Sequence, residues 1–404
     1  MDVEEARTIG RRLRQIRKAR EKALVVVAEL AGMSKSKLDR IERGEHALDK
    51  LSDIVALANA LQVAPSDLTR LPVPAPANGH TDATTTAVRR ALNAVESDEP
   101  NGLVLPVAVL REHVTRIHAQ LRACRFAEVA TDLPGLIRNL HTTLNTGTDH
   151  ADLLELAVHL HVHVTWMWLL NAGASHDLRL RTVFLAQRLA RERNEITTLA
   201  IAGWGVVDAV LFSGDVAESR AVLGSIALPS TTSETAGLVA KLTAIHAFAA
   251  VLQGHPEDGI APFEAVAELA ERFGSTGKPD SRGFLYSSTS TAIDRTWFAL
   301  ENDEPDQAVN IAQQVDPRRH PFVVNQSYYW IHSGRALSKL PGRDDDAIRA
   351  LRTAEQLFPT AVLRNQGVRE VLGEMLTRPQ RGAMGAELRA MAYRAGVLTE
   401  QIGA

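Results

Sequence analysis

The twenty residues from 24 to 43 constrain the fold of this chain more than any other segment. Their pattern predicts two short helices that cross at a tight turn. Ala28 supplies the small side chain that such a crossing needs, and Gly32 tolerates the left-handed backbone of the turn. Ser34 is placed to cap the second helix, and Gly44 is placed to end it. The positions that pin the two helices together are all apolar: Val27, Ala31, Met33, Leu38 and Ile41.

The flanking residues extend this pattern into a small domain. Residues 9–17 predict a preceding helix, residues 51–61 a fourth helix, and residues 65–68 the start of a fifth. About the first 70 residues resemble the Cro and phage-repressor class of helix-turn-helix domains, known as the Xre family. The resemblance implies a five-helix, lambda-repressor-like DNA-binding domain over residues 1–71. Its second motif helix would enter the major groove of duplex DNA.

The outward face of that second helix carries the residues expected to read DNA. Lys and Arg side chains donate hydrogen bonds to guanine or to phosphate, and Ser can contact either. The alternative is that Asp39, Glu42 and Arg43 only form surface pairs along the helix. For Arg11, Arg12 and Arg14 of the preceding helix, we expect no specific role. The predicted DNA-binding residues are Ser34, Lys35, Ser36, Lys37, Asp39, Arg40 and Arg43.

The start of the first motif helix departs from the family. Xre domains usually have Ser or Thr followed by Gln there, and the glutamine contacts the DNA backbone. Here Ala23 and Leu24 take those places, and Val25 and Val26 follow. The change removes a cap and a polar contact, and it adds apolar surface. Either this surface packs against something else, or the affinity for DNA is modest.

Charge is distributed unevenly along the chain. Residues 7–50 hold 13 basic and 6 acidic residues, whereas the whole chain has a net charge of -3. A basic head on an acidic body favours binding of a polyanion at one end, although a solvated helix face would have the same composition. Because a single domain of this kind binds weakly, we expect a homodimer on a palindromic double-stranded DNA operator.

The rest of the chain reads as a linker followed by an all-α body. Residues 72–101 contain three alternating prolines, which favour an extended linker, with one helical stretch over 86–95. Over residues 102–404, breaks at Gly214, Gly254, Asn302 and Gly342 are 40, 48 and 40 residues apart. This spacing predicts stacked helical hairpins. The expected hairpins are 107–143, 150–192, 195–226, 234–273, 284–315 and 322–358, with capping helices at 365–378 and 384–396.

The last hairpin resembles a tetratricopeptide repeat (TPR), because its small residues and its closing Pro359 have the same offsets. A TPR-like α-solenoid has a concave face that binds peptides, proteins or small molecules. We therefore expect residues 102–404 to sense a small-molecule or peptide effector and to dimerise. The candidate ligand-binding residues lie in first helices of hairpins: His159, His163, Trp166, Trp204, Asn325, Tyr328, Tyr329 and His332.

Other chemistry finds less support in the sequence. Asp152, Glu155, His159 and His163 share a helical face and could bind a metal, but a polar groove lining is favoured and no metal is predicted. No phosphate loop, HExxH or GxSxG motif is present, so we expect neither an enzyme nor a cofactor. A single cysteine, Cys124, and the lack of a signal peptide or a long apolar run favour a cytoplasmic protein with no membrane contact.

The two-part layout resembles ligand-responsive regulators of Gram-positive bacteria, and residues 315–397 look most like an actinobacterial branch. This resemblance implies a sequence-specific transcriptional regulator of secondary metabolism or quorum-type signalling. The alternative is a TPR scaffold that binds partner proteins and has weak or no affinity for DNA.

Overall fold

The computed structural model describes residues 3–20, 22–46, 48, 51–61, 79–211, 215–274, 279, 283–378 and 382–397. The described residues are helical or lie in turns and loops, and none forms a strand, so the all-α prediction is confirmed. The chain divides into two compact units. We call residues 1–84 the N-terminal unit and residues 85–400 the C-terminal unit.

The N-terminal unit contains four described helices: α1 (Val3–Ala19), α2 (Leu24–Leu30), α3 (Lys35–Glu42) and α4 (Leu51–Leu61). The predicted crossing is present, because Val27 and Ala28 of α2 share a buried core with Leu38 and Ile41 of α3. Gly32 has a φ of 64°, as the turn requires. The fifth helix expected at residues 65–68 lies outside the described residues.

A buried ion pair fixes α1 against the end of α3. The Arg17 guanidinium donates two hydrogen bonds to the Glu42 carboxylate, at 2.6 and 2.8 Å, and a third to the Lys22 carbonyl at 3.0 Å. Glu42 is only 5% exposed. It is therefore part of the core of the N-terminal unit, and the alternative interpretation, in which it belongs to a surface pair, is wrong for Glu42.

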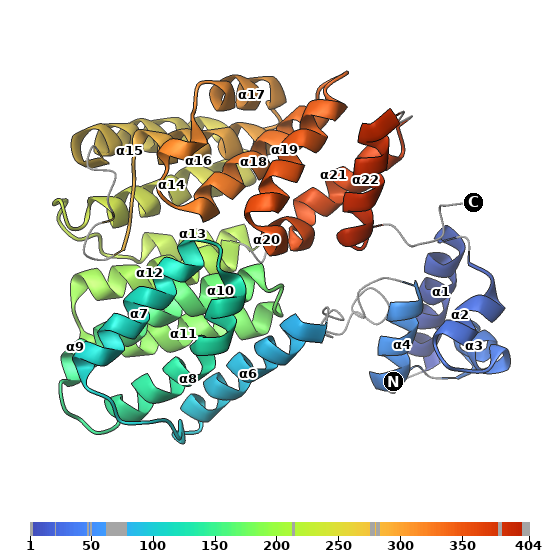
Figure 1. Cartoon of the computed structure of the whole chain (residues 1–404), viewed down its shortest axis with the longest axis horizontal. Helices are drawn as coiled ribbons and strands as arrows, with labels where there is room; N and C mark the ends of the chain where they lie inside the picture. Colours follow the sequence, from blue (N-terminus) through green and yellow to red (C-terminus); the bar gives the residue numbers. More distant parts are fainter. Residues whose placement is uncertain are drawn as a thin grey trace. The chain divides into compact units, whose positions relative to one another are not determined.

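The C-terminal unit is a succession of helical hairpins (Figure 1). Each connecting turn is short, so consecutive helices pack against each other. All six expected hairpins are present within a few residues of their predicted bounds. Their helices are α7 (Val107–Arg122) with α8 (Phe126–Leu144), α9 (His150–His159) with α11 (His176–Arg193), α12 (Ile196–Leu211) with α13 (Val216–Gly224), α14 (Ala236–Leu252) with α15 (Ile260–Phe273), α16 (Ser288–Glu301) with α17 (Pro305–Gln313), and α18 (Val323–Ser338) with α19 (Asp344–Leu357).

Much of the expected linker is a helix, α6 (Gly79–Glu96), which is longer than the stretch predicted over 86–95. Val88, Ala91, Leu92 and Val95 form an apolar stripe that is buried in the main core of the C-terminal unit. Arg138 of α8 donates to the carbonyl of Pro100 at 2.8 Å. The second half of this interval is therefore packed structure, because its apolar residues recur at helical spacing.

The first helix of the second hairpin is interrupted by a wider turn. Residues 160–166 form a π-helix between α9 and α10 (Met167–Asn171). The whole run from His150 to Asn171 is the one described helix that is long and apolar enough to cross a membrane, and 78% of its most apolar window is buried inside the protein. Such burial is what a core helix shows. π-turns within helices often occur at functional sites.

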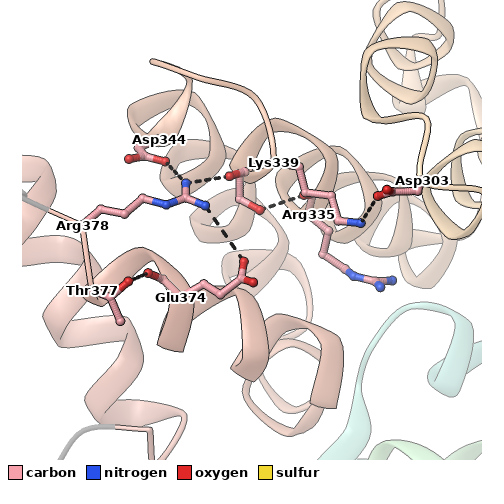
Figure 2. Close-up of polar contacts among 8 residues, drawn as sticks. Asp303, Arg335, Lys339, Asp344, Glu374, Thr377 and Arg378 are labelled. Carbon is pink, nitrogen blue, oxygen red and sulfur yellow. Dashed lines mark hydrogen bonds and ion pairs between the residues drawn. The ribbon is translucent and has the colours of Figure 1, made fainter.

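Three helices follow the last hairpin: α20 (Pro359–Arg364), α21 (Gln366–Leu376) and α22 (Gly382–Arg394). Arg378 attaches α21 to the last hairpin, since its guanidinium donates to the Ser338 carbonyl at 2.7 Å and to the Asp344 carboxylate at 2.8 Å (Figure 2). Lys339 pairs with Asp303 at 3.1 Å, which ties α18 to the turn after α16. These contacts fix the position of α21, which borders the cavity described below.

Candidate functional site

Helix α3 presents a polar face away from the core of the N-terminal unit. The Ser34 hydroxyl accepts a hydrogen bond from the Lys37 backbone N–H at 3.2 Å, so it caps α3 as predicted. Lys35, Ser36 and Arg40 are exposed. Neither Lys35 nor Arg40 has an ion pair with another described residue. Both side chains are therefore free to approach a polyanion.

Other predicted DNA-binding residues already have partners within the N-terminal unit. The Lys37 ammonium pairs with the Asp53 carboxylate of α4 at 2.7 Å and is one-third exposed. Arg43 pairs with Asp39 at 2.9 Å and with Glu45 at 3.0 Å. Asp39 and Arg43 thus form the surface pair that was the alternative interpretation of this helix. Exposed pairs of this kind contribute little to stability, so Arg43 can exchange its partner for a phosphate.

The unusual start of α2 is visible on the surface. Ala23 occupies the N-cap position with an extended backbone and provides no side-chain hydrogen bond. Val25 is 43% exposed and Leu30 is 60% exposed. The sequence departure therefore leaves an uncapped helix end and an exposed Val25, and Leu30 adds a second exposed apolar side chain at the other end of α2.

A cavity of about 540 Å³ lies within the C-terminal unit. The first helix of each of the six hairpins contributes to its wall, whereas the second helices contribute nothing among the described residues. Residues 283–285, His320 and Phe322 before α18, and residues 365–370 at the start of α21 complete the lining. A volume of this size matches a site for a drug-sized molecule.

Aromatic and imidazole rings in contact with one another form two groups along the wall. In the first group, Trp204 lies 5.5 Å from His163 and 5.2 Å from Phe284 between ring centroids. In the second group, Trp297 lies 4.2 Å from Phe248 and 5.5 Å from His332, whose ring stacks on that of Tyr328. Such rings offer flat apolar surfaces and, on their faces, negative potential.

The charged groups of the cavity are largely paired with one another. The Lys241 ammonium lies 3.2 Å from the Asp294 carboxylate, which also accepts a hydrogen bond from the Tyr286 hydroxyl at 2.8 Å. Arg335 pairs with Glu301 at 3.1 Å. The Arg122 guanidinium binds the Gly283 carbonyl and lies 4.1 Å from the centroid of the Phe322 ring.

Asp208 differs from these groups, because it has no hydrogen bond or ion pair to another described residue. Burial raises the pKa of this carboxyl to about 7; Lys241 opposes this shift and Asp294 adds to it. Asp208 is the one charged residue of the mostly apolar helix α12. Lys241 is likewise the one Lys, Arg, Asp or Glu of the mostly apolar helix α14. Sequence analysis missed both residues, although a lone charge in an apolar helix is a recognisable signal.

The histidines of the cavity are neutral. Burial lowers the pKa of His332 to about 3 and that of His320 to about 4, and it holds the pKa values of His118 and His163 well below 6.5. His163 Nε2 and His332 Nδ1 are buried and have no hydrogen-bond partner among the described residues. These two atoms can form hydrogen bonds with a bound molecule.

The cavity brings together most of the predicted ligand-binding residues. It is lined by His163, Trp166, Trp204, Asn325, Tyr328 and His332. His159 does not line it; its Nε2 lies 2.9 Å from Nδ1 of His118, and His118 takes its place in the wall. Tyr329 also faces elsewhere and donates to the Ala312 carbonyl at 2.9 Å, because adjacent helical positions point in different directions.

The structure does not support a metal site at Asp152, Glu155, His159 and His163. Asp152 is exposed and lies 3.4 Å from the Arg111 guanidinium, and His159 is bonded to His118. Among the described residues, no group of three or more His, Cys, Asp or Glu side chains has an arrangement that could hold a metal ion.

Comparison with known proteins identifies the N-terminal unit only. Residues 8–71 match a family described as a helix-turn-helix domain. No curated protein and no solved structure matches the chain significantly. The chain therefore contains a helix-turn-helix domain, which is the class of module that binds DNA.

Proposed function

We propose that this protein is a transcriptional regulator of the Xre type, whose N-terminal unit binds duplex DNA through α3 and whose TPR-like C-terminal unit binds an effector. The observation that carries the proposal is the exposed polar face of α3. A helix capped by Ser34 presents Lys35, Ser36 and Arg40 away from a well-packed core. No catalytic role is needed to account for any of these features.

The three exposed residues suit the edges of base pairs. Lys35 and Arg40 can donate to O6 and N7 of guanine or to phosphate, and Ser36 can contact either. Lys37, held by Asp53, is better placed to position α3 than to read a base. A homodimer that places two α3 helices about 34 Å apart would bind a palindromic operator.

The effector would bind in the cavity of the C-terminal unit and change the affinity for DNA by favouring one arrangement of the dimer. Support comes from the size of the cavity and from its lining by all six hairpins. An effector that binds across several hairpins can shift their relative positions, which is the change that a ligand-controlled regulator needs.

The exposed Val25 and Leu30 favour a second candidate, a scaffold that binds a partner protein and has little affinity for DNA. Fluorescence anisotropy distinguishes the two functions. The full-length protein is used to select fragments from its own genome, and the selected duplex is then titrated at several salt concentrations.

We expect Lys35→Ala with Arg40→Ala to weaken binding by at least about 30-fold, because each lost contact costs about 1–3 kcal/mol. The matched control, Arg89→Ala with Arg389→Ala, also removes two exposed positive charges and should change the affinity less than threefold. Selection of no duplex, or equal binding by both double variants, would contradict DNA binding through α3 and leave the scaffold as the better account.

A further inference from the structure

We propose that the cavity of the C-terminal unit binds a small organic cation, an amine carried on an aromatic or apolar skeleton, with Asp208 as its counter-ion. This inference deepens the proposed function, on which it rests only for the effect of the ligand on DNA binding. Among the described residues, Asp208 is the one carboxylate of the cavity wall with no hydrogen bond or ion pair. A buried charge without a partner is costly, and a bound cation would remove that cost.

The other charges of the cavity leave Asp208 as the available anion. Lys241 is satisfied by Asp294 at 3.2 Å, and Arg335 is satisfied by Glu301 at 3.1 Å. Asp294 further accepts the Tyr286 hydroxyl. Lys241 and Arg335 thus each have a carboxylate partner, and the Arg122 guanidinium is held by the Gly283 carbonyl and the Phe322 ring. A ligand carboxylate would have to displace one of these contacts to bind a positive charge of the wall.

The aromatic rings favour the same class of ligand. Trp204 precedes Asp208 by one helical turn on α12, and both line the cavity. Tyr328 of α18 also lines the cavity; burial raises the pKa of its phenol to about 12, and the charge of Asp208 adds to this shift. Asp208 is therefore close to a member of each of the two groups of rings. Ring faces near a carboxylate attract an ammonium group and the apolar skeleton attached to it.

Protonation of Asp208 should make the affinity for a cation depend on pH near neutrality. The charged groups that act on this carboxyl are Lys241 of α14 and Asp294 of α16, and its own charge acts on Tyr328 of α18. Its pKa of about 7 means that a bound proton competes with a cation below neutrality. The cavity histidines stay uncharged over the same range, because burial lowers their pKa values. Affinity for an amine should therefore increase from pH 6 to pH 8.

Three probes of nearly equal shape test the proposal: 4-phenylbutylamine, 4-phenylbutanol and 4-phenylbutyrate. Each is titrated into the full-length protein by isothermal calorimetry at pH 8. We expect the amine to bind at least about tenfold more tightly than the alcohol, which corresponds to about 1.4 kcal/mol, and the acid to show no binding. The amine should bind about tenfold more tightly at pH 8 than at pH 6, because the amine is protonated at both pH values whereas Asp208 is mostly ionised only at pH 8.

Two variants locate the site. Asp208→Asn keeps the shape of the side chain and should bring the amine to within about twofold of the alcohol. Ala244→Leu fills part of the cavity and should weaken the amine and the alcohol together. Asp258→Asn, on an exposed turn, is the matched control and should behave as the wild type. Circular dichroism establishes that each variant is folded.

A preference for the amine that depends on Asp208 supports the proposal. Equal binding of amine and alcohol by the wild type, a preference retained by Asp208→Asn, or no binding of any probe would overturn it. Failure of the proposed function has a different signature: the amine would bind in an Asp208-dependent manner while the protein selects no duplex, or while the amine leaves the DNA affinity unchanged.

Discussion

At the scale of single residues, Gly10 shows how closely the helices of the N-terminal unit approach. It lies in α1 where that helix meets the end of α3. A Cβ at this position would be 2.3 Å from the Ile41 carbonyl oxygen and 2.9 Å from that of Glu42. Backbone atoms cannot retreat as a flexible side chain can. The position therefore accepts glycine only, despite its cost within a helix.

Gly10→Ala should destabilise the N-terminal unit by about 2 kcal/mol or more, because an added methyl group would force α1 away from α3. Urea denaturation measures this change. Gly135→Ala is the control, since a Cβ at Gly135 of α8 meets no atom within 4 Å and alanine favours a helix. A Gly10→Ala protein as stable as the wild type would show that the two helices are less closely packed than described.

Asp208 makes the stability of the C-terminal unit depend on pH. Its folded pKa of about 7 exceeds the unfolded value of 3.8, so the folded protein holds a proton that the unfolded chain releases. Stability from this group is therefore present at low pH and is lost as the pH rises toward 7.

Asp208→Asn removes this dependence. In the absence of ligand, the variant should melt about 3 °C higher than the wild type at pH 8, and this difference should shrink as the pH falls to 5. Differential scanning calorimetry at both pH values checks the prediction, with Asp258→Asn as the control. A lower melting temperature for Asp208→Asn at pH 8 would mean that the ionised carboxylate has a stabilising partner.

At the scale of elements, the attachment of α21 determines how the cavity is bordered. Asn365, Gly367 and Glu370 line the cavity near the start of α21, whereas Arg378 anchors the chain just after its end (Figure 2). The Asn365 side chain also caps α21 by accepting a hydrogen bond from the Val368 N–H at 3.0 Å. One helix thus connects the cavity wall to a polar anchor on the last hairpin.

Arg378→Gln should loosen α21 without unfolding the C-terminal unit, because it removes the charge that holds Asp344 and weakens the bond to Ser338. Hydrogen exchange of α21 amides should become about fivefold faster, as expected for a loss of about 1 kcal/mol in a partly exposed pair. Arg352→Gln, whose ion pair with Glu387 is long at 3.7 Å, should leave α21 unchanged. Unaltered exchange in Arg378→Gln would assign the attachment of α21 to apolar packing alone.

At the scale of the whole molecule, the two units offer two separate sites on one chain. Thermodynamic linkage requires that a ligand which alters DNA affinity is itself bound more or less tightly when DNA is present, by the same factor. A regulator therefore has two equal changes of affinity, one for each ligand, whereas a protein whose two units bind independently has neither.

We expect saturating 4-phenylbutylamine to change the dissociation constant for the selected duplex by about fivefold or more, and the duplex to change the affinity for the amine by the same factor. Anisotropy measures the first change and calorimetry the second. The Asp208→Asn protein should bind DNA normally and show neither effect. Independent binding of the two ligands would contradict regulation through this cavity.

Local sequence determined the crossed helices of the N-terminal unit and the approximate bounds of the six hairpins. Each of three residues acts on neighbours close in the chain. Ala28 allows the helices to cross, Gly32 adopts the backbone conformation of the turn, and Ser34 caps α3. Local sequence also shows which helices come first in each hairpin, because helical periodicity and short turns are both visible in it. Most of the predicted ligand-binding residues were found on those first helices. The apolar stripe of α6 was equally readable, but the adjacent prolines favoured a linker over that interval.

Tertiary structure alone decided which polar groups are free. Lys37 and Lys35 are alike in sequence, yet Lys37 faces Asp53 of α4 and Lys35 faces solvent. Lys241 and Asp208 are each the one charged residue of a mostly apolar helix, yet Lys241 pairs with Asp294 and Asp208 has no ion pair or hydrogen bond within the described part of the chain. Such pairings join residues far apart in the chain, and their distances depend on how whole helices pack, which no local pattern encodes.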